Sequence, residues 1–149
     1  MYYHFTFEKY YEEMLADGFI KPGKHRNCLP YDEKLNIGSV GDDPDYSKYI
    51  YLAKDKKVLN SFIIELHECG PDFLNMELLL DKITDKEYNE KLDDLGDIVV
   101  LKIPEKLIDK KYIIDDFNVV KSCKSYAYPL DIPMNGVQVL KRLGDYEII

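Results

Sequence analysis

The sequence predicts a single α+β domain over residues 1–149, with helices dominating the first two thirds and strands the last third. A chain of 149 residues has the length of one domain with one core. Helical spacing of apolar residues recurs before residue 96, whereas short apolar runs bounded by turn residues follow it. Apolar residues make up 46% of the chain and charged residues 32%, which is typical of a globular domain.

A strand followed by a helix is predicted at the N-terminus. Residues 2–6, Tyr-Tyr-His-Phe-Thr, form an aromatic-rich run typical of a strand. Thr6 is the expected N-cap of the helix, because its hydroxyl can accept a backbone hydrogen bond from the first turn. Apolar spacing over residues 7–15 favours the helix, and Gly18 lies where a C′ glycine ends one. Phe19–Pro22 then predicts a short extended segment.

A long loop separates this unit from the next strand and helix. Residues 22–47 hold several prolines and glycines without a sustained period, and they predict a loop of unusual length. Residues 48–53 predict a strand, after which Asp55 is the expected cap of a helix with apolar positions from Val58 to Leu66.

Two further helices precede the strongest strand signal of the chain. They are predicted over residues 73–81 and 85–95, and the second opens with a capping box made by Thr84 and Glu87. The unbroken apolar run in residues 97–103 predicts a central strand that is buried on both faces. Further strands are expected over residues 112–120, 125–130 and 136–143.

Composition excludes several classes of protein. The net charge of −8 argues against duplex nucleic acid as a high-affinity partner. Cys28, Cys69 and Cys123 are odd in number and widely spaced, which favours a reducing compartment over a disulfide framework. His67 and Cys69 lack a matching second pair, so we expect no metal site. No apolar run has the length of a membrane span and no signal peptide is visible, so we expect a cytoplasmic protein without a membrane partner.

Three parts of the chain together resemble a known superfamily. They are Tyr3–Thr6 with the following Met14–Pro22 (MLADGFIKP), the strand Tyr49–Ala53 (YIYLA), and Ile98–Ile103 followed by Asp115, Asp116 and Ile132–Val137 (IPMNGV). In this order and spacing they resemble proteins of the ADP-ribosyltransferase fold, in the class that uses a His–Tyr–Glu set.

The resemblance implies a split two-sheet ADP-ribosyltransferase-like fold, in which residues 70–96 are a helical insertion. It implies that NAD is bound as a substrate and that ADP-ribose is transferred to a protein or nucleic-acid acceptor. By analogy, a small bacterial or phage toxin, effector or modifier would suit a chain of this size.

The resemblance also assigns roles to individual residues. His4 would contact a ribose hydroxyl, and Tyr51 would stack on the nicotinamide ring. A cation would meet the pyrophosphate. The implied cofactor-binding set is His4, Phe5, Thr6, Lys24, Arg26, Tyr51 and Lys54.

The third catalytic position departs from the pattern of the family. The glutamate is expected near residues 125–126, where this chain has Ser125 and Tyr126. We take Tyr126 as the third catalytic candidate beside His4 and Tyr51, and Ser125, Asp131 and Gln138 remain alternatives. Neither a tyrosine nor a serine carries a fixed negative charge at neutral pH.

Two other functions therefore stay open. The first is a catalytically atypical or inactive module of the same fold that binds a nucleotide or a protein. The second is a relative of the RNA 2′-phosphotransferases, which share the early histidine. Such a protein would need several arginines around a phosphate, and the chain contains only Arg26 and Arg142.

Overall fold

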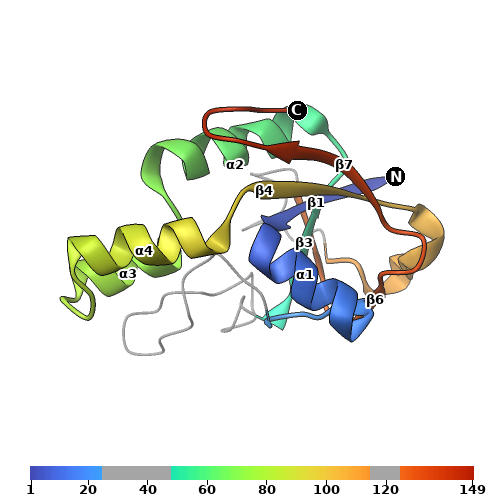
Figure 1. The fold of residues 1–149 in the computed structure, drawn as a ribbon. Helices are drawn as coiled ribbons and strands as arrows, with labels where there is room; N and C mark the ends of the chain where they lie inside the picture. Colours follow the sequence, from blue (N-terminus) through green and yellow to red (C-terminus); the bar gives the residue numbers. More distant parts are fainter. Residues whose placement is uncertain (25–47, 115–124) are drawn as a thin grey trace.

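Two antiparallel sheets and four α-helices make up the part of the protein that the computed structural model describes, residues 1–24, 48–114 and 125–149 (Figure 1). The strands are β1 (Tyr2–Phe7), β2 (Phe19–Ile20), β3 (Ile50–Ala53), β4 (Ile98–Ile103), β5 (Ser125–Tyr128), β6 (Ile132–Pro133) and β7 (Gln138–Leu143). The helices are α1 (Glu8–Asp17), α2 (Lys56–Cys69), α3 (Asp72–Leu79) and α4 (Asp85–Leu95), and 3₁₀ turns cover Glu105–Leu107 and Lys110–Tyr112. The predicted α+β class with its opening strand–helix unit is confirmed.

The larger sheet has five strands in the order β5-β3-β1-β4-β7. β1 therefore lies at its centre, and it pairs with β4 along its whole length, from Tyr2 opposite Ile103 to Phe7 opposite Ile98. Its pairing with β3 is much shorter, with Tyr3 opposite Ala53 as the register pair. The interior position of β4 explains its apolar run Ile98–Leu101, because helices or loops cover both faces of a strand in that position.

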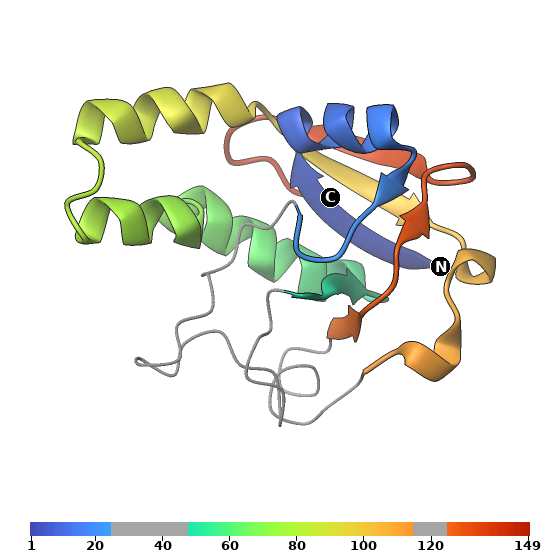
Figure 2. The same cartoon turned by 90° about the horizontal axis from the view of Figure 1, so that it is seen from below.

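The smaller sheet joins two segments that are far apart in the sequence. β2 and β6 pair with Phe19 opposite Pro133 and Ile20 opposite Ile132. The amide of Met134 also donates to the carbonyl of Gly18 at 2.9 Å. Figure 2 shows β2 and β6 side by side near α1.

The five-stranded sheet separates two apolar cores. We call them the first core, on the side of α1 and the small sheet, and the second core, on the side of α2, α3 and α4 (Figures 1 and 2). Alternation along β4 divides its residues between them, with Val99, Leu101 and Ile103 in the first. Ile98 and Val100 belong to the second.

The start of α1 differs from the prediction. Its N-cap is Phe7 and no side chain caps it, so the prediction that Thr6 caps this helix is wrong. Thr6 is still a strand residue opposite Val99, and its side chain is buried in the sheet rather than available to the helix. The end of α1 agrees with the prediction, because Gly18 adopts φ 81° and closes the helix.

The caps of the later helices are confirmed. Asp55 accepts from the amide of Lys57 at the start of α2, and Thr84 forms the capping box with Glu87 at the start of α4. α3 and α4 lie side by side and extend beyond the sheet (Figure 2). Leu74, Ile83 and Leu95, all from residues 70–96, are buried in the second core. The segment 70–96 therefore contributes side chains to the folded core.

The strands predicted in the C-terminal third are shorter than expected. Of residues 112–120, those after 114 lie outside the described residues, and Tyr112 ends a 3₁₀ turn. Ile114 makes only an isolated bridge with Ala127. β7 begins at Gln138, because Met134 and Val137 close a turn around the positive-φ residue Gly136. Most of the predicted loop, residues 25–47, also lies outside the described residues.

Candidate functional site

The side chain of His4 makes a specific contact across the centre of the larger sheet. Its Nδ1 lies 2.8 Å from the carbonyl oxygen of Tyr51, where β1 and β3 are close but no longer paired. A carbonyl can only accept a hydrogen bond, so Nδ1 carries the proton and donates it. The His4 ring thus donates to a main-chain carbonyl of the neighbouring strand that the short pairing of β1 with β3 does not satisfy.

The protonation of His4 follows from this environment. Burial lowers the pKa of His4 below its ordinary value, and the hydrogen bond to the Tyr51 carbonyl offsets part of that effect. The ring is therefore neutral at pH 7, with its proton on Nδ1 and a lone pair on Nε2. Nε2 can accept a hydrogen bond from a ligand hydroxyl, and it cannot act as a positively charged group.

The side chain of Tyr51 does not join His4. Tyr3 and Ala53 are directly opposite and share a face, and Tyr51 lies two residues before Ala53 on that same face. His4, adjacent to Tyr3, points to the other face. The structure thus brings His4 to the backbone of Tyr51 but places the two side chains on opposite sides of the sheet.

Tyr126 lies on the face of His4. It is opposite Leu52 in the pairing of β5 with β3, and Leu52 is a residue of the first core. Its ring meets the ring of Tyr2 edge-on, with centroids 6.1 Å apart. Lys54 spans both rings, its Nζ 5.0 Å from the Tyr2 centroid and 5.8 Å from that of Tyr126. Three residues named from the sequence, His4, Tyr126 and Lys54, thus share one face, which we call the His4 face.

The other members of the predicted cofactor-binding set have different positions. Phe5 packs against the second core, on the opposite face. Lys24 is ion-paired with Asp17 at the end of α1. Arg26 lies outside the described residues. Thr6 lies two residues after His4 on β1 and therefore on the same face. It is only 4% exposed, and no hydrogen bond to its hydroxyl is found within the described part of the chain.

The alternatives for the third position differ in where they point. Ser125 is opposite Ala53 and so lies on the face away from His4. Asp131 is exposed immediately before β6, and Gln138 is exposed on the edge strand β7. Of the four candidates, only Tyr126 has a strand register that places it on the His4 face.

One carboxylate near this face had not been predicted. Glu105, just after β4, lies 3.9 Å from Lys54 and 3.5 Å from Lys110, and it also contacts the amino group of Met1 at 3.1 Å. The contact with the Met1 amino group, followed by the charge of Lys110, lowers the pKa of Glu105, so it is ionised at neutral pH. Its only sequence signal was its position directly after a buried strand and Pro104.

The described residues add two further findings. Among residues 1–24, 48–114 and 125–149, no group of three or more histidine, cysteine or carboxylate side chains could hold a metal ion. No helix in the same ranges combines the length and apolar character needed to cross a bilayer.

The fold and the site define an α+β protein with two antiparallel sheets and a histidine on the central strand. Comparisons of the chain with protein-family models, with curated proteins and with solved structures found no match.

Proposed function

We propose that this chain is an ADP-ribosyltransferase-like protein that binds NAD on the His4 face. The observation that carries the proposal is the state of His4, a neutral ring with its proton fixed on Nδ1 by the Tyr51 carbonyl. Nε2 is then an acceptor of fixed direction on a central strand, which suits a ribose hydroxyl. The segments that carry the resemblance support the proposal, because β1, β3 and β4 are neighbours and β2 pairs with β6.

The geometry changes the role of the two tyrosines. Tyr126 shares a face with His4, so it is the better partner for the flat nicotinamide ring. Lys54, which lies over Tyr126, is then the described cation best placed for the pyrophosphate. Tyr51 contributes its carbonyl, which fixes the ring of His4, rather than its side chain.

ADP-ribose transfer to a macromolecular acceptor is the activity that the resemblance implies. Cleavage of the nicotinamide–ribose bond develops positive charge on the ribose, and a nearby carboxylate stabilises such charge. Tyr126 occupies the position expected for that carboxylate. This substitution favours a second candidate function, a module that binds NAD without transferring ADP-ribose.

A phosphotransferase function is less well supported. Arg142 donates to Glu8 at 3.0 Å and lies over the ring of Tyr11, 5.3 Å from its centroid. It is therefore engaged at the start of α1, on a different part of the sheet from His4.

Calorimetric titration of the full chain with NAD tests the proposal. We expect His4→Ala and Tyr126→Ala to weaken binding about tenfold each, which is the usual size of a lost stacking or hydrogen-bonding contact. Tyr51→Ala should weaken it less than Tyr126→Ala, and Tyr112→Ala, which removes an exposed ring from a 3₁₀ turn, is the control. Absence of heat at millimolar NAD would overturn the proposal.

Incubation with NAD labelled in its adenosine half then separates the two candidates. If the chain hydrolyses NAD or modifies itself and Tyr126→Phe abolishes that activity, the result would support ADP-ribose transfer with Tyr126 at the third catalytic position. NAD binding without either product would instead establish the binding module.

A further inference from the structure

Lysines gather at the edge of the larger sheet where β1 begins and where β3 and β4 end. The strand order brings three segments that are distant in the sequence to this edge: the start of β1, the residues after β3 and the 3₁₀ turns after β4 (Figure 1). Neither the resemblance nor the proposed function gives this edge as a whole a role. We call it the lysine edge, and its members are Lys54, Lys56, Lys102, Lys106, Lys110 and Lys111.

The two tyrosines at the start of β1 have lysines beside them. Lys102 is opposite Tyr3 in the pairing of β4 with β1, and the Nζ of Lys56 lies 5.7 Å from the centroid of the Tyr3 ring. The Nζ of Lys54 lies 5.0 Å from the centroid of the Tyr2 ring. Lysines that follow β3, begin α2 and end β4 therefore belong to one group around the start of β1.

Glu105 is shared by several cations of this edge. It lies 3.9 Å from Lys54 and 3.5 Å from Lys110, and it also contacts the amino group of Met1 at 3.1 Å. One negative charge cannot neutralise three positive charges, so an excess of positive charge remains around Glu105.

The remaining lysines add to this excess. Asp109 lies 3.7 Å from Lys111, and Asp55 is the N-cap of α2. Within the described part of the chain, no ion pair is found for the other three lysines, which are Lys56, Lys102 and Lys106. The lysine edge is therefore a positively charged patch on a chain whose net charge is −8.

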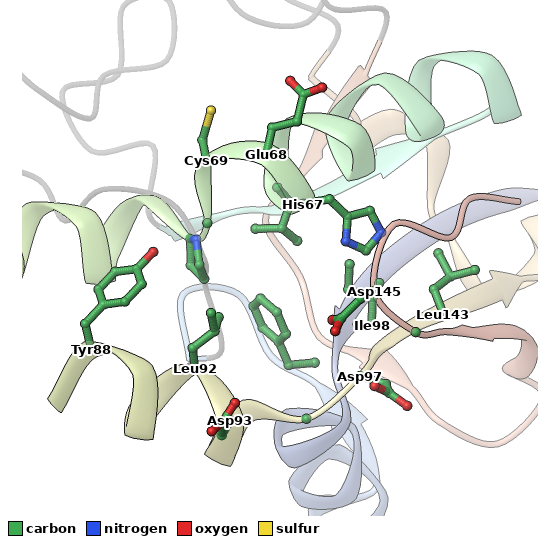
Figure 3. A pocket seen from close by; sticks show the side chains of 16 residues that line it. His67, Glu68, Cys69, Tyr88, Leu92, Asp93, Asp97, Ile98, Leu143 and Asp145 are labelled. Atoms are coloured by element: carbon green, nitrogen blue, oxygen red, sulfur yellow. The ribbon is translucent and has the colours of Figure 1, made fainter. Parts of the chain in front are cut away.

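The other end of the same strands is acidic. Asp97 directly precedes β4, and Asp145 lies in the turn that follows β7. Glu68 and Asp93, from the last turns of α2 and α4, line the same pocket as these two aspartates (Figure 3). Charge is thus divided along the strand direction, so an anionic ligand is attracted to the lysine edge and repelled by the opposite end.

An exposed aromatic ring lies among the lysines. Tyr112 ends the second 3₁₀ turn and is 44% exposed, with the Nζ of Lys111 5.1 Å from its ring centroid. A nucleic-acid base can stack on such a ring while the neighbouring lysine contacts a phosphate. An acidic segment of a protein would satisfy the lysines but has no flat group for the ring.

The charge of the whole chain favours a single strand over a duplex. A duplex would bring a long, rigid row of phosphates close to a chain of net charge −8. A single strand is flexible enough to follow a local patch, and its unpaired bases are free to stack on an aromatic side chain.

We propose that the lysine edge binds single-stranded nucleic acid, with phosphates on the lysines and a base on Tyr112. Lys54 also belongs to the His4 face, so a strand bound here would lie beside the proposed NAD site. The inference does not rest on NAD binding, because the experiment below changes residues that the proposed NAD site does not use.

Fluorescence anisotropy of a labelled oligothymidylate or oligouridylate of about twelve nucleotides, titrated with the full chain, tests the proposal. We expect Lys106→Gln combined with Lys111→Gln to weaken binding about tenfold. The dependence of log affinity on log salt should become less steep by about 1.4, because each phosphate contact with a single strand contributes about 0.7. Both lysines are exposed, so the variant should fold.

A change of the tyrosine separates base stacking from charge. Tyr112→Ala should weaken binding about tenfold without changing the salt dependence, and Tyr112→Phe, which keeps a ring, should bind like the unaltered chain. Lys82→Gln combined with Lys86→Gln is the control for the lysine variant. It removes the same charge from exposed positions at the corner between α3 and α4, at the far end of the molecule (Figure 1).

Binding of either oligonucleotide supports the proposal, and three outcomes would overturn it. The first is no change in anisotropy at about 100 μM protein, the weak end of non-specific binding. The second is an equal loss of affinity in the control variant, which would mean that net charge alone matters. The third is binding of poly-glutamate as tightly as of the oligonucleotides, which would assign the edge to an acidic protein segment. Tyr112→Ala should leave NAD binding unchanged, so this proposal and the proposed function can fail separately.

Discussion

At the scale of single residues, His4 serves the backbone of a neighbouring strand through one ring nitrogen and keeps a lone pair on the other. Its Nδ1 donates to the Tyr51 carbonyl in place of a main-chain amide, because the pairing of β1 with β3 is short. An unsatisfied buried carbonyl would cost about 1–3 kcal/mol. The same hydrogen bond fixes the tautomer, so the structural contact determines which nitrogen carries the lone pair.

The lowered pKa of His4 predicts how stability depends on pH. Its pKa in the folded protein lies below the ordinary value of 6.5, so the unfolded chain binds a proton in the interval between them and the folded chain does not. The free energy of unfolding is therefore unaffected by His4 above pH 6.5 and falls as the pH drops below it, by at most about 1.4 kcal/mol per pH unit. Urea unfolding at pH 7.5, 6.5 and 5.5 measures this.

His4→Asn is the matched variant, because its side-chain Nδ2 occupies the position of Nδ1 and can still donate to the Tyr51 carbonyl but does not titrate. It should lose less stability between pH 6.5 and pH 5.5 than the unaltered chain. Parallel losses in the two proteins would show that His4 is not the group responsible.

At the scale of secondary-structure elements, the corner between α2 and α3 controls how α4 packs. Gly70 ends α2, and the hydroxyl of Tyr88 from α4 fills the space beside it. Asn75 of α3 bonds both Tyr88 and the carbonyl of Cys69. Residues of α2, α3 and α4 therefore meet at this one glycine.

Substitution of this glycine should be costly for two reasons. Gly70→Ala strains a backbone with φ 76° and places a Cβ 2.1 Å from the Tyr88 hydroxyl, so we expect a loss of about 2–3 kcal/mol in the free energy of unfolding. Gly18→Ala, at φ 81° with open space around its Cβ, should cost about 1 kcal/mol, from the backbone alone. Denaturant unfolding compares the two.

A second variant isolates the contact with Tyr88. In the Tyr88→Phe background the hydroxyl is absent, and Gly70→Ala should cost less than it does in the unaltered chain. Equal costs in both backgrounds would mean that backbone strain alone makes Gly70 necessary.

How far the sequence predicts these elements depends on the range of the interaction that forms them. The caps at Asp55 and Thr84 are local, and both were predicted correctly. Thr6 was wrongly assigned as a cap, because pairing with β4 keeps it in the sheet, and strand pairing is not visible in a local pattern. The face of Tyr51 required the register of β1 against β3, which links residues 50 apart. The row of buried side chains formed by Phe7, Ile98 and Leu143 likewise exists only once β1, β4 and β7 are aligned.

At the scale of the whole molecule, the five-stranded sheet divides the protein into two faces with different chemistry. The His4 face presents an acceptor nitrogen, a tyrosine and a lysine. The opposite face is covered by α2, α3 and α4, and the acidic residues Glu68, Asp93, Asp97 and Asp145 line a pocket there (Figure 3). The net charge of −8 does not describe this division, because the local distribution of charge differs between the two faces.

The residues after β7 connect this sheet to α2 through the side chains of Asn60 and His67. Asn60 donates to the carbonyl of Ile149 at 2.7 Å and accepts from its amide at 2.9 Å, while Ile149 packs against the second core. Asn60→Ala removes both hydrogen bonds, so we expect a loss of about 1–3 kcal/mol in the free energy of unfolding. Hydrogen exchange of the Ile149 amide should become faster, because it would lose its acceptor, whereas Tyr146 and Glu147 stay attached to α2 through His67. Asn89→Ala, on the exposed face of α4, should change neither measurement; unchanged exchange in Asn60→Ala would show that the packing of Ile149 and the hydrogen bonds of His67 hold the segment without Asn60.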